Sequence, residues 1–596
     1  MEKVIDIYEK KINHYKEQLE KLNKSYNVIS ILRLLTIVIT AVFMYLAYKN
    51  SYILYLILVV FLGVILFLYL AKIHEGQYNK KVKISELVKI NENEISRNNG
   101  KWKKFKDKGE EYLDLKHSFI NDLDVFGKNS LFQWINTTKT IYGRSKLSAL
   151  LKMKKLPNKD EVLNRQESLK ELAEKLDFRQ ELIASLKVKK NNNDEESFLN
   201  QWVKNRNEKI FSLKVRLLKI ILPVINFLIL ILVIANVITW HFIIISLIIS
   251  FLFLRTINKE VLDGLLIFEE LKYKIKSYVD SIELIEKENF KTESLNKLKS
   301  NFENNKKASE KLNDLQGITS WLYDRGNAFY IIFNTFLLWD YQMIYKLEKW
   351  RIANGDELIN WLETLGEFEA LISLSSLIYN NPNWCVPSIT EDKHLEGTNV
   401  SHPILGESAV GNSFSITDKK RVLLITGSNM SGKSTFLRTV GFSVIMSYLG
   451  LNVRGESFCT PILNIYTCMR TADNLEESIS SFYAEILRIK SIVEGSNRGE
   501  KILFLLDEIF KGTNSLDRHL GAEVLINQLL KGDTIGLVST HDLELCEMES
   551  EDNRIGNYNF REYYENNKLR FDYKLRKGVS KTRNARYLMK MAGIDI

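Results

Sequence analysis

The stretch Arg421–Thr435, RVLLITGSNMSGKST, decides the fold of the C-terminal third of this 596-residue chain. It begins with a short apolar, β-branched run, passes through a loop that contains Gly427 and Gly432, and leads into an apolar-periodic helix from Phe436 onward. In a strand–loop–helix unit of this kind, the glycines let backbone N–H groups face an anion, and the helix N-terminus adds partial positive charge. The sequence therefore predicts an α/β domain with a phosphate-binding loop, which we place over residues 386–596.

The residues of this loop have separate expected roles in binding ATP and Mg²⁺. Lys433 supplies a cation to the β- and γ-phosphates, and Ser434 supplies a hydroxyl ligand for Mg²⁺. The predicted nucleotide-binding residues of the loop are Gly427, Ser428, Asn429, Met430, Ser431, Gly432, Lys433, Ser434 and Thr435.

Two further apolar runs end in residues that suit ATP hydrolysis. Residues 501–506 (KILFLL) end at Asp507-Glu508, which fits a Walker B element in which Asp507 binds Mg²⁺ through water and Glu508 polarises the attacking water. Residues 534–540 (TIGLVST) end at His541, which can reach the γ-phosphate. We predict Lys433, Glu508 and His541 as catalytic residues, with Ser434 and Asp507 as the Mg²⁺ ligands.

Four long apolar segments interrupt the rest of the chain. Residues 29–48 are apolar except for Arg33 and residues 53–71 throughout, while residues 220–238 and 239–254 follow one another without a charge. Runs of roughly 16–20 apolar residues are long enough to cross a bilayer core of about 30 Å. The short turns between them predict two transmembrane hairpins, at 29–71 and 220–254. The alternative is two buried pairs in a soluble protein, but core helices rarely stay apolar on every side for this length.

The basic residues that flank these segments predict their orientation. They cluster outside the hairpins and are almost missing from the turns, so the positive-inside rule places the soluble segments in the cytoplasm of a multi-pass cell-membrane protein. An even number of spans agrees with this topology. The flanking residues are Lys10, Lys11, Lys16, Lys21, Lys24, Lys72, Lys80, Lys81, Lys83, Arg216, Lys219, Arg255 and Lys259.

Residues 1–28 carry a heptad pattern, and residues 72–117 are predicted to form a helical stalk. The apolar positions of the heptad are Ile5, Tyr8, Ile12, Tyr15, Leu19, Leu22 and Tyr26. The pattern fits a helix that packs against the stalk in antiparallel fashion, or a coiled coil that joins two chains. We favour the stalk, because the first membrane hairpin already brings the two helices side by side.

Composition indicates the structure of the remaining residues, the kinds of partner and the state of the cysteines. Residues 118–385 have a helical apolar period outside the second hairpin, and only 6 prolines in the chain agree with an all-α region. The charge of +10 (83 Lys and Arg against 73 Asp and Glu) suits nucleic acid or an anionic membrane face. The four cysteines form no CxxC pair, which predicts unlinked thiols rather than disulfides or a zinc site.

Several of these motifs resemble the MutS family of DNA mismatch-repair ATPases, within the ABC-type ATPase class. The similar segments are GSNMSGKSTFLRTVG at 427–441, LFLLDEIFKGTNSLDR at 503–518 and STHDLEL at 539–545. His402-Pro403 resembles the start of the family's ATPase domain, and Gly578 with residues 585–593 resembles its closing segment. A weaker resemblance to the family's lever-helix core covers segments at 123–132, 136–144, Arg165-Gln166 and 368–377.

The resemblance implies a homodimer in which each nucleotide lies between the phosphate loop of one chain and a serine of its partner. The segment DNLEESISSFYAE at 473–485 resembles the one that carries this serine, so Ser480 or Ser481 is expected in that role. Residues 118–385 would then be lever helices interrupted by the second hairpin. A heptad helix and a membrane hairpin stand where the family has its mismatch-reading and connector domains, and no DNA clamp is identified. Phe368 lies in an apolar-periodic helix, so we expect a core residue rather than a mismatch wedge.

Three functions fit these features. The first is a membrane-anchored MutS-like ATPase whose dimer closure moves lever helices and which acts on DNA, mismatched or structured, or on a nucleoprotein partner. The second is a membrane ATPase that remodels a membrane or protein partner without binding DNA. The third, half of an ABC transporter, is the least favoured, because four spans make a thin transport path and contain no acidic residue.

Overall fold

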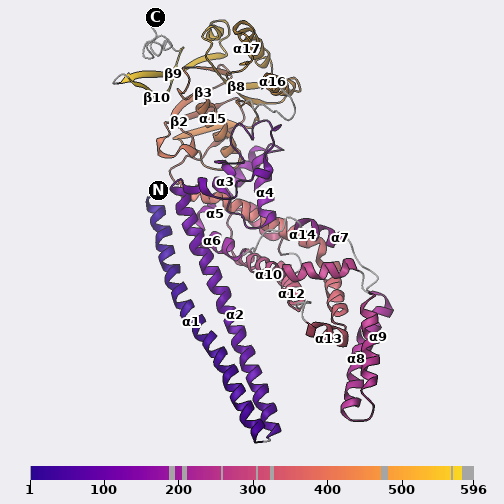
Figure 1. Cartoon of the computed structure of the whole chain (residues 1–596). Helices are drawn as coiled ribbons and strands as arrows, with labels where there is room; N and C mark the ends of the chain where they lie inside the picture. Colours follow the sequence, from indigo (N-terminus) through magenta and orange to yellow (C-terminus); the bar gives the residue numbers. More distant parts are fainter. Residues whose placement is uncertain are drawn as a thin grey trace.

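The computed structural model describes residues 2–50, 52–186, 195–204, 211–256, 259–303, 306–321, 328–470, 481–565 and 568–579. An α/β head lies at one end, a helical middle region follows, and two helical hairpins extend from the middle region in the same general direction (Figure 1). The hairpins are more than 110 residues apart in the chain, so their common direction is a property of the tertiary structure.

The first hairpin consists of α1 (Glu2–Lys49) and α2 (Ile53–Asn98), which run antiparallel along their length (Figure 1). The heptad positions of α1 are buried or half-buried, with Tyr8 fully buried, because this face packs against α2 and the adjoining helices. The heptad face of α1 thus faces α2 within one chain, while the helix predicted over 72–117 ends at Asn98 and is followed by the short 3-10 helices η1 and η2. Within the apolar part, a Cβ on Gly63 would come within 2.4 Å of Thr40, so the absence of a side chain lets the two helices approach closely.

The apolar part of this hairpin is exposed along almost all its length. Ile53, Leu54 and Tyr48, for example, are 74%, 81% and 76% exposed. By length and composition, α1, α2 and α8 are each apolar enough to cross a membrane. Arg33, the charged exception in the first segment, lies over the ring of Phe67 and contacts Nδ1 of His74 just beyond the second segment.

The second hairpin consists of α8 (Leu213–Ile234) and α9 (His241–Leu254). The apolar run predicts a third span that continues to residue 238, but α8 ends at Ile234 and residues 235–240 form the turn. Asn236 adopts a left-handed conformation (φ 57°), which asparagine tolerates better than most residues and which ends the helix early. As a result α9 has 14 residues and is the shortest of the four apolar helices.

The middle region is helical, and α14 (Trp339–Asn380) is its longest helix. Phe368 on α14 is completely buried, as predicted. The fully buried carboxylate of Glu369 accepts hydrogen bonds from the backbone N–H groups of Lys139 and Thr140, and it thereby fixes the start of α4 against α14. The other elements are η1 (Lys101–Lys104), η2 (Glu110–Tyr112), α3 (Leu131–Ile135), α4 (Ile141–Lys152), α5 (Lys159–Glu174), α6 (Leu176–Ser185), α7 (Glu195–Lys204), α10 (Lys259–Lys287), α11 (Glu293–Ser300), α12 (Ala308–Ser320) and α13 (Ala328–Leu337).

The head contains two sheets. The six-stranded sheet has the order β10-β9-β4-β8-β7-β6, with β9, β4, β8, β7 and β6 parallel and β10 antiparallel at the edge. The four-stranded sheet has the order β1-β5-β2-β3. Their strands are β1 (Ser388–Thr390), β2 (Leu395–Val400), β3 (Asn412–Ile416), β4 (Val422–Thr426), β5 (Ser457–Pro461), β6 (Asn464–Cys468), β7 (Ile502–Asp507), β8 (Thr534–Thr540), β9 (Ile555–Glu565) and β10 (Lys568–Lys577).

Helices cover both faces of the six-stranded sheet, so its central strands are buried on both sides. Leu423 and Leu505 pack with α15 (Lys433–Tyr448) into the core that continues into the middle region. Leu424 and Leu506 pack on the other face with α16 (Ser481–Asn497) and α17 (Ser515–Leu529). The remaining short elements are η4 (Pro403–Ser408), η5 (Glu544–Glu547) and α18 (Met548–Glu551).

Candidate active site

The loop between β4 and α15 has the backbone that the glycines were expected to allow. Gly427 and Gly432 have φ angles of 148° and 109°, in a region that side chains disfavour. A Cβ on Gly427 would meet the hydroxyl oxygen of Ser431 at 2.7 Å and the carbonyl oxygen of Phe560 at 3.0 Å. Met430 at the loop tip is 82% exposed, whereas Ser431 is buried, so the loop presents one side to solvent and folds the other inward.

Lys433 lies at the centre of the site. Its Nζ donates hydrogen bonds to the carbonyl oxygens of Gly427 (2.9 Å) and Ser428 (3.1 Å), and it lies 3.5 Å from Oε1 of Glu508. Burial lowers the pKa of Lys433, and the nearby Glu508 carboxylate opposes that shift. The ammonium group is therefore held in the loop's interior, where it can contact an anion bound there.

Glu508 and His541 come from different strand ends and meet beside Lys433. Nε2 of His541 lies 2.6 Å from Oε1 of Glu508, 3.4 Å from Nζ of Lys433 and 2.7 Å from the side-chain oxygen of Asn429. The hydrogen bond from His541, together with Lys511 at 3.0 Å, holds the pKa of Glu508 well below its usual range despite partial burial. Glu508 thus remains a carboxylate, the form that a general base requires.

Glu508 is also held in an unusual backbone conformation. Its φ is 49°, and its N–H donates to the carbonyl oxygen of Ser539 on β8. The neighbouring strand therefore fixes the direction of the side chain. The next carboxylate back in the chain, Asp507, accepts a hydrogen bond from the hydroxyl of Ser539.

The residues present suit Mg²⁺ and a nucleotide phosphate. The hydroxyl oxygen of Ser431 is buried in the loop and has no hydrogen-bond partner among the described residues, which leaves a donor available to an oxyanion. Ser434 lies in the first turn of α15 and Asp507 at the end of β7, so one hydroxyl and one carboxylate are available as the hard oxygen ligands that Mg²⁺ prefers. The exposed Thr435 follows on the same turn.

The two serines expected to reach a partner chain are only partly observed. Ser480 lies outside the described residues, and Ser481 is the first residue of α16. The helix that follows them is tied to the site, because the buried carboxylate of Glu485 accepts a hydrogen bond from the N–H of Phe510, two residues after Glu508. The closing segment at 585–593 also lies outside the described residues, whereas Gly578 is described.

A cluster of ion pairs joins the site to the middle region and was not predicted from the sequence. Asp122 is fully buried and accepts hydrogen bonds from the Thr467 hydroxyl, from the N–H groups of Met469 and Arg470, and from Arg488 on α16. An acidic residue within the apolar stretch 119–126 was the available signal.

The neighbouring Asp124 extends this cluster to the phosphate-loop helix. It pairs with Arg470 at 2.6 Å and with Arg438, which lies on α15 one turn beyond Ser434. Residues 118–127 therefore pack on the head, although they precede the middle helices in the chain.

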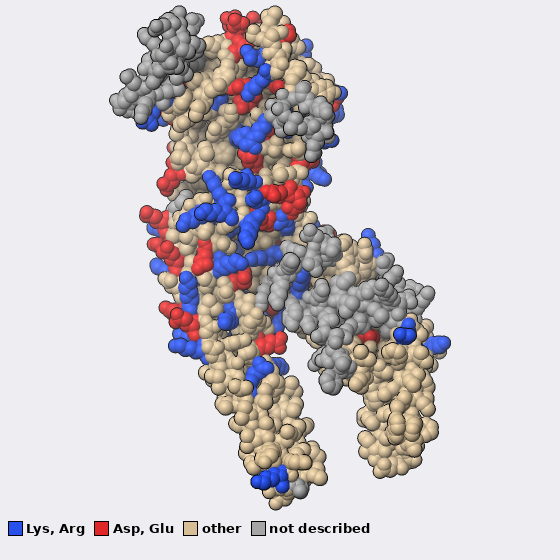
Figure 2. Space-filling view, viewed as in Figure 1, with Lys and Arg blue, Asp and Glu red and all other residues tan. Residues whose placement is uncertain are grey.

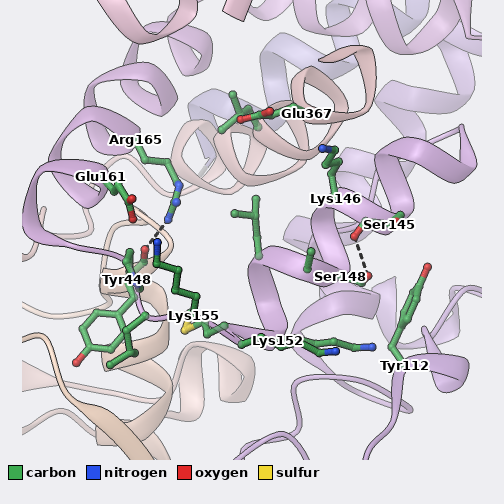
Figure 3. Close-up of a pocket in the computed structure, with 17 residues that line it drawn as sticks. Tyr112, Ser145, Lys146, Ser148, Lys152, Lys155, Glu161, Arg165, Glu367 and Tyr448 are labelled. Carbon is green, nitrogen blue, oxygen red and sulfur yellow. Dashed lines mark hydrogen bonds between the residues drawn. The ribbon is translucent and has the colours of Figure 1, made fainter. Parts of the chain in front are cut away.

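A second cavity, of about 580 Å³, lies between α4, α5, α14 and the C-terminal end of α15 (Figure 3). It is basic: Arg165 donates to the carbonyl oxygen of Tyr448, and the side chain of Lys152 reaches across the cavity to the ring of Tyr112. Lys146, Lys154 and Lys155 also line it, together with Glu161 and Glu367. This cavity is separate from the phosphate loop and contains none of the predicted catalytic residues.

Comparison with known proteins agrees with this geometry. The family model for MutS domain V matches residues 423–595. The C-terminal region is similar to MutS domain V. DNA mismatch repair protein MutS of Methanosarcina acetivorans is 28% identical over 265 residues, which are 43% of this chain and 29% of that protein. The MutS proteins of Aquifex pyrophilus and Listeria monocytogenes serovar 1/2a are 27% and 29% identical over 262 and 246 residues, or 43% and 40% of this chain and 30% and 28% of those proteins.

The similarity to MutS proteins covers part of this chain and part of each relative. This chain spans less than a third of the length of these relatives. The match includes the phosphate loop, Glu508 and His541, and the α/β sheets at the C-terminus fit MutS domain V. The two hairpins lie outside the region that the family model matches.

Proposed function

We propose that this protein is a membrane-anchored, MutS-like ATPase that binds ATP with Mg²⁺ at the 427–435 loop and hydrolyses it. One observation carries the proposal: Lys433, Glu508 and His541 come from three separate elements, and each lies within 3.5 Å of the other two. A structural ion pair needs only two of these groups. Three of them beside a glycine-bent loop match the needs of phosphoryl transfer, which depends on positioning and on charge stabilisation.

Each residue of the site would have a separate role in ATP hydrolysis. ATP with Mg²⁺ would supply the phosphoryl group and the cation that neutralises its charge. Lys433 would stabilise negative charge on the phosphates, while Glu508 would accept a proton from the attacking water. His541 would orient Glu508 and contact the γ-phosphate. Ser434 and Asp507 would hold Mg²⁺.

We further propose that the active unit is a homodimer. Ser480 or Ser481 of one chain would contact the nucleotide bound to the other chain, as the resemblance to MutS implies. The bond between Glu485 and Phe510 would then link the serine-bearing helix α16 to the loop after Glu508. ATP binding would favour closure of the two heads, and hydrolysis would favour their opening.

Contacts within the chain offer a route from the head to the hairpins. The Asp122 and Asp124 cluster joins α15 and α16 to the start of the middle region. At the end of α14, Asn380 accepts from the hydroxyl of Tyr8 on α1 and donates to Glu94 on α2. At its beginning, Gln342 donates to the carbonyl oxygen of Lys219 on α8. Helix α14 thus contacts both hairpins, and its movement would reach both.

Exposure and direction support the membrane assignment. The hairpins project from the same side of the molecule, and the visible surfaces of their parts farthest from the head are almost free of charge, apart from a basic group at the tip of the first hairpin (Figures 1 and 2). Water would leave this much apolar surface unfavourably hydrated, whereas acyl chains would cover it. We expect the intact chain to sediment with membranes and to require detergent for extraction; recovery in the soluble fraction without detergent would contradict the anchoring.

The substrate proposal is DNA, mismatched or structured, or a nucleoprotein held near the membrane. It is supported by the relatives, which are named as DNA mismatch repair proteins, and by the basic cavity beside the head. The second candidate is an ATPase that remodels a membrane or protein partner without DNA. The contacts that lead from the head through α14 to both hairpins support this second candidate as well as the relatives and the basic cavity support DNA.

A titration separates the two candidates. Detergent-purified full-length protein would be titrated with duplex, mismatched and branched DNA at low and physiological salt, with and without ATP. Binding that weakens steeply with salt, and that changes with ATP, would support DNA as the partner. No binding at low salt by a preparation that still hydrolyses ATP would exclude DNA and leave the second candidate.

A further inference from the structure

Helix α13 (Ala328–Leu337), which is too short to cross a membrane, presents an apolar face beside the second hairpin. Ile331, Ile332 and Phe333 are 57%, 64% and 42% exposed. Three adjacent large apolar side chains in water would be costly, at about 25 cal/mol for each Å² of apolar surface. A covering surface is therefore expected over this helix.

The polar side chains of α13 are satisfied within the protein, including Thr335, whose hydroxyl donates to the carbonyl oxygen of Ile331. The hydroxyl of Tyr330 donates to Asp340 at 2.6 Å, and the amide of Asn334 donates to the other oxygen of Asp340 at 2.7 Å. The chain turns sharply at Leu338, which is left-handed (φ 51°) and buried against Leu222 and Tyr341. The helix is thus fixed in orientation, with its apolar side outward.

Asn226 shows how deep α13 lies along the hairpin. Its side-chain amide donates to the carbonyl oxygen of Phe336 at 2.8 Å, and it also bonds to Ser250 and Ser246 on α9. Asn226 is seven residues beyond Lys219, the last basic residue of α8, which corresponds to about 10 Å along a helix. If the basic residues lie at the headgroups, the C-terminal end of α13 lies within the apolar layer.

The hydrogen bonds at this depth pair polar groups that lipid could not hydrate. The carbonyl groups of the last turn of a helix have no partner within the helix. In hydrocarbon such groups must find partners in the protein, and Asn226 satisfies that of Phe336. Asn226 itself is completely buried and bonded only to neutral groups in the contacts described.

Two tryptophans mark where the chain approaches and leaves this layer. Trp321, at the end of α12, is 54% exposed, and Trp339 begins α14. Their rings lie 5.7 Å apart, and the indole N–H of Trp339 donates to the carbonyl oxygen of Trp321. Tryptophan is enriched at membrane–water interfaces. Both ends of the segment therefore lie on the same side of the bilayer.

We propose that α13 is a re-entrant helix that inserts into the cytoplasmic leaflet beside α8 and α9, with Ile331, Ile332 and Phe333 against the lipid acyl chains. The inference rests on the proposed membrane anchoring and adds a lipid contact made by the lever itself, because α13 continues through Leu338 into α14. The occupant of the face is the phospholipid bilayer. The reason is continuity: α13 packs against the exposed apolar surfaces of α8 and α9.

The test places an environment-sensitive fluorophore on single cysteines of the full-length protein in phosphatidylcholine vesicles. The half-exposed Cys385 and Cys459 are first replaced by serine, since Cys468 and Cys546 are buried. The probe is attached at Ile332→Cys. Lipids with a quencher at the headgroup end or at the tail end of the acyl chain then report depth.

Two isoleucines of similar exposure provide matched controls. Ile244→Cys lies on α9 (43% exposed), and Ile352→Cys lies on α14 outside the apolar layer (45% exposed). Each labelled protein must retain nucleotide binding, which shows that it is folded. We expect the probe at residue 332 to lose fluorescence to lipid quenchers about as strongly as the probe at residue 244, with stronger quenching near the headgroup, and the probe at residue 352 to lose none.

The failures are distinguishable. If the probe at 244 is quenched and the probe at 332 is not, α13 is not in the bilayer, and the hairpin assignment stands. If neither is quenched, the membrane anchoring fails and the inference fails with it. If the probe at 332 is shielded from water but not quenched by lipid, protein covers the face, from a second copy or from elsewhere in the chain, and the inference is overturned.

Discussion

The proposed catalytic site, a cleft lined by Glu508 and His541, and the second hairpin both bury polar groups, but they do so with opposite chemistry. In the cleft, charged groups from three elements gather around Lys433, within 3.5 Å of Glu508 and His541. At the hairpin, the buried polar cluster around Asn226 is made of amide, hydroxyl and carbonyl groups. Charge is therefore concentrated where we propose that an ionic substrate binds, whereas the contacts around Asn226, within the hairpin that we propose lies in lipid, are neutral.

The difference shows what each region can tolerate. A charge in the cleft has a counter-charge and access to water, whereas an unpaired charge in hydrocarbon costs several kcal/mol. The neutral cluster can hold α8, α9 and α13 together without that cost. Substitutions should therefore have the largest effect at the charged site and the smallest at exposed ion pairs.

The largest effect is expected in the cleft. Glu508→Gln keeps the size of the side chain but removes the carboxylate, so ATP turnover should fall by at least about 100-fold while ATP binding persists. Lys433→Ala should lower both binding and turnover, because it removes the cation from the loop. Turnover by phosphate release and binding by a fluorescent nucleotide check both variants, and the exposed Lys531→Ala serves as control. Unchanged turnover in Glu508→Gln would refute the assigned base.

A half-buried histidine in the head, His402, should make the stability of the head depend on pH. Burial, with a contribution from Arg438, lowers the pKa of His402 to about 4 from its ordinary 6.5. Between these values the unfolded chain binds a proton that the folded chain does not, so stability is full above pH 6.5 and falls as the pH drops towards 4, by up to about 3 kcal/mol. Thermal unfolding of the head across this range measures it.

The matched variants for that experiment are His402→Gln and His394→Gln. His402→Gln should flatten the pH dependence. His394→Gln, at a half-exposed position one residue before β2, should leave the pH dependence unchanged. A dependence that survives in His402→Gln would show that other groups are responsible.

The neutral cluster should have a smaller effect on stability. Asn226→Leu has nearly the same volume but removes the bonds to Phe336, Ser246 and Ser250, at an expected cost of about 1 kcal/mol in apparent stability in lipid or detergent. The lipid-quenching signal of a probe at Ile332 should also weaken, because α13 loses its attachment to α8. Val224→Leu, at an exposed position of the same helix, should change neither quantity.

The smallest effect is expected at the surface pair of Asp124 and Arg470. Arg470 is 41% exposed, so water screens the pair, and a double-mutant cycle with Asp124→Asn and Arg470→Gln should give a coupling energy of about 0.5 kcal/mol. A coupling of several kcal/mol would show that this junction is far more important to the head than its exposure indicates.

Local patterns predicted much of the head. The strands expected at 421–426, 501–506 and 534–540 are observed as β4, β7 and β8, because short apolar runs next to glycine and acidic turns have few other stable structures. The same local pattern predicted the loop residues, Glu508 and His541 as site residues, because their spacing in the chain is set by a strand, a turn and a helix; their roles stay a prediction. The heptad of α1 was likewise readable from its period.

What the sequence did not determine depends on contacts between distant residues. Asp122 and Asp124 pack on the head more than 300 residues away in the chain, and no local period reports such a pairing. The early end of α8 at Ile234 was also missed. The placement of α13 beside Asn226 was missed because a ten-residue apolar helix has the same pattern in a core as in a membrane. By itself the sequence determined which segments are apolar and where phosphate chemistry could occur. Only the tertiary structure decided that Glu508, His541 and Lys433 meet and that both hairpins extend to the same side, since these depend on strand order and helix packing rather than on neighbours in the chain.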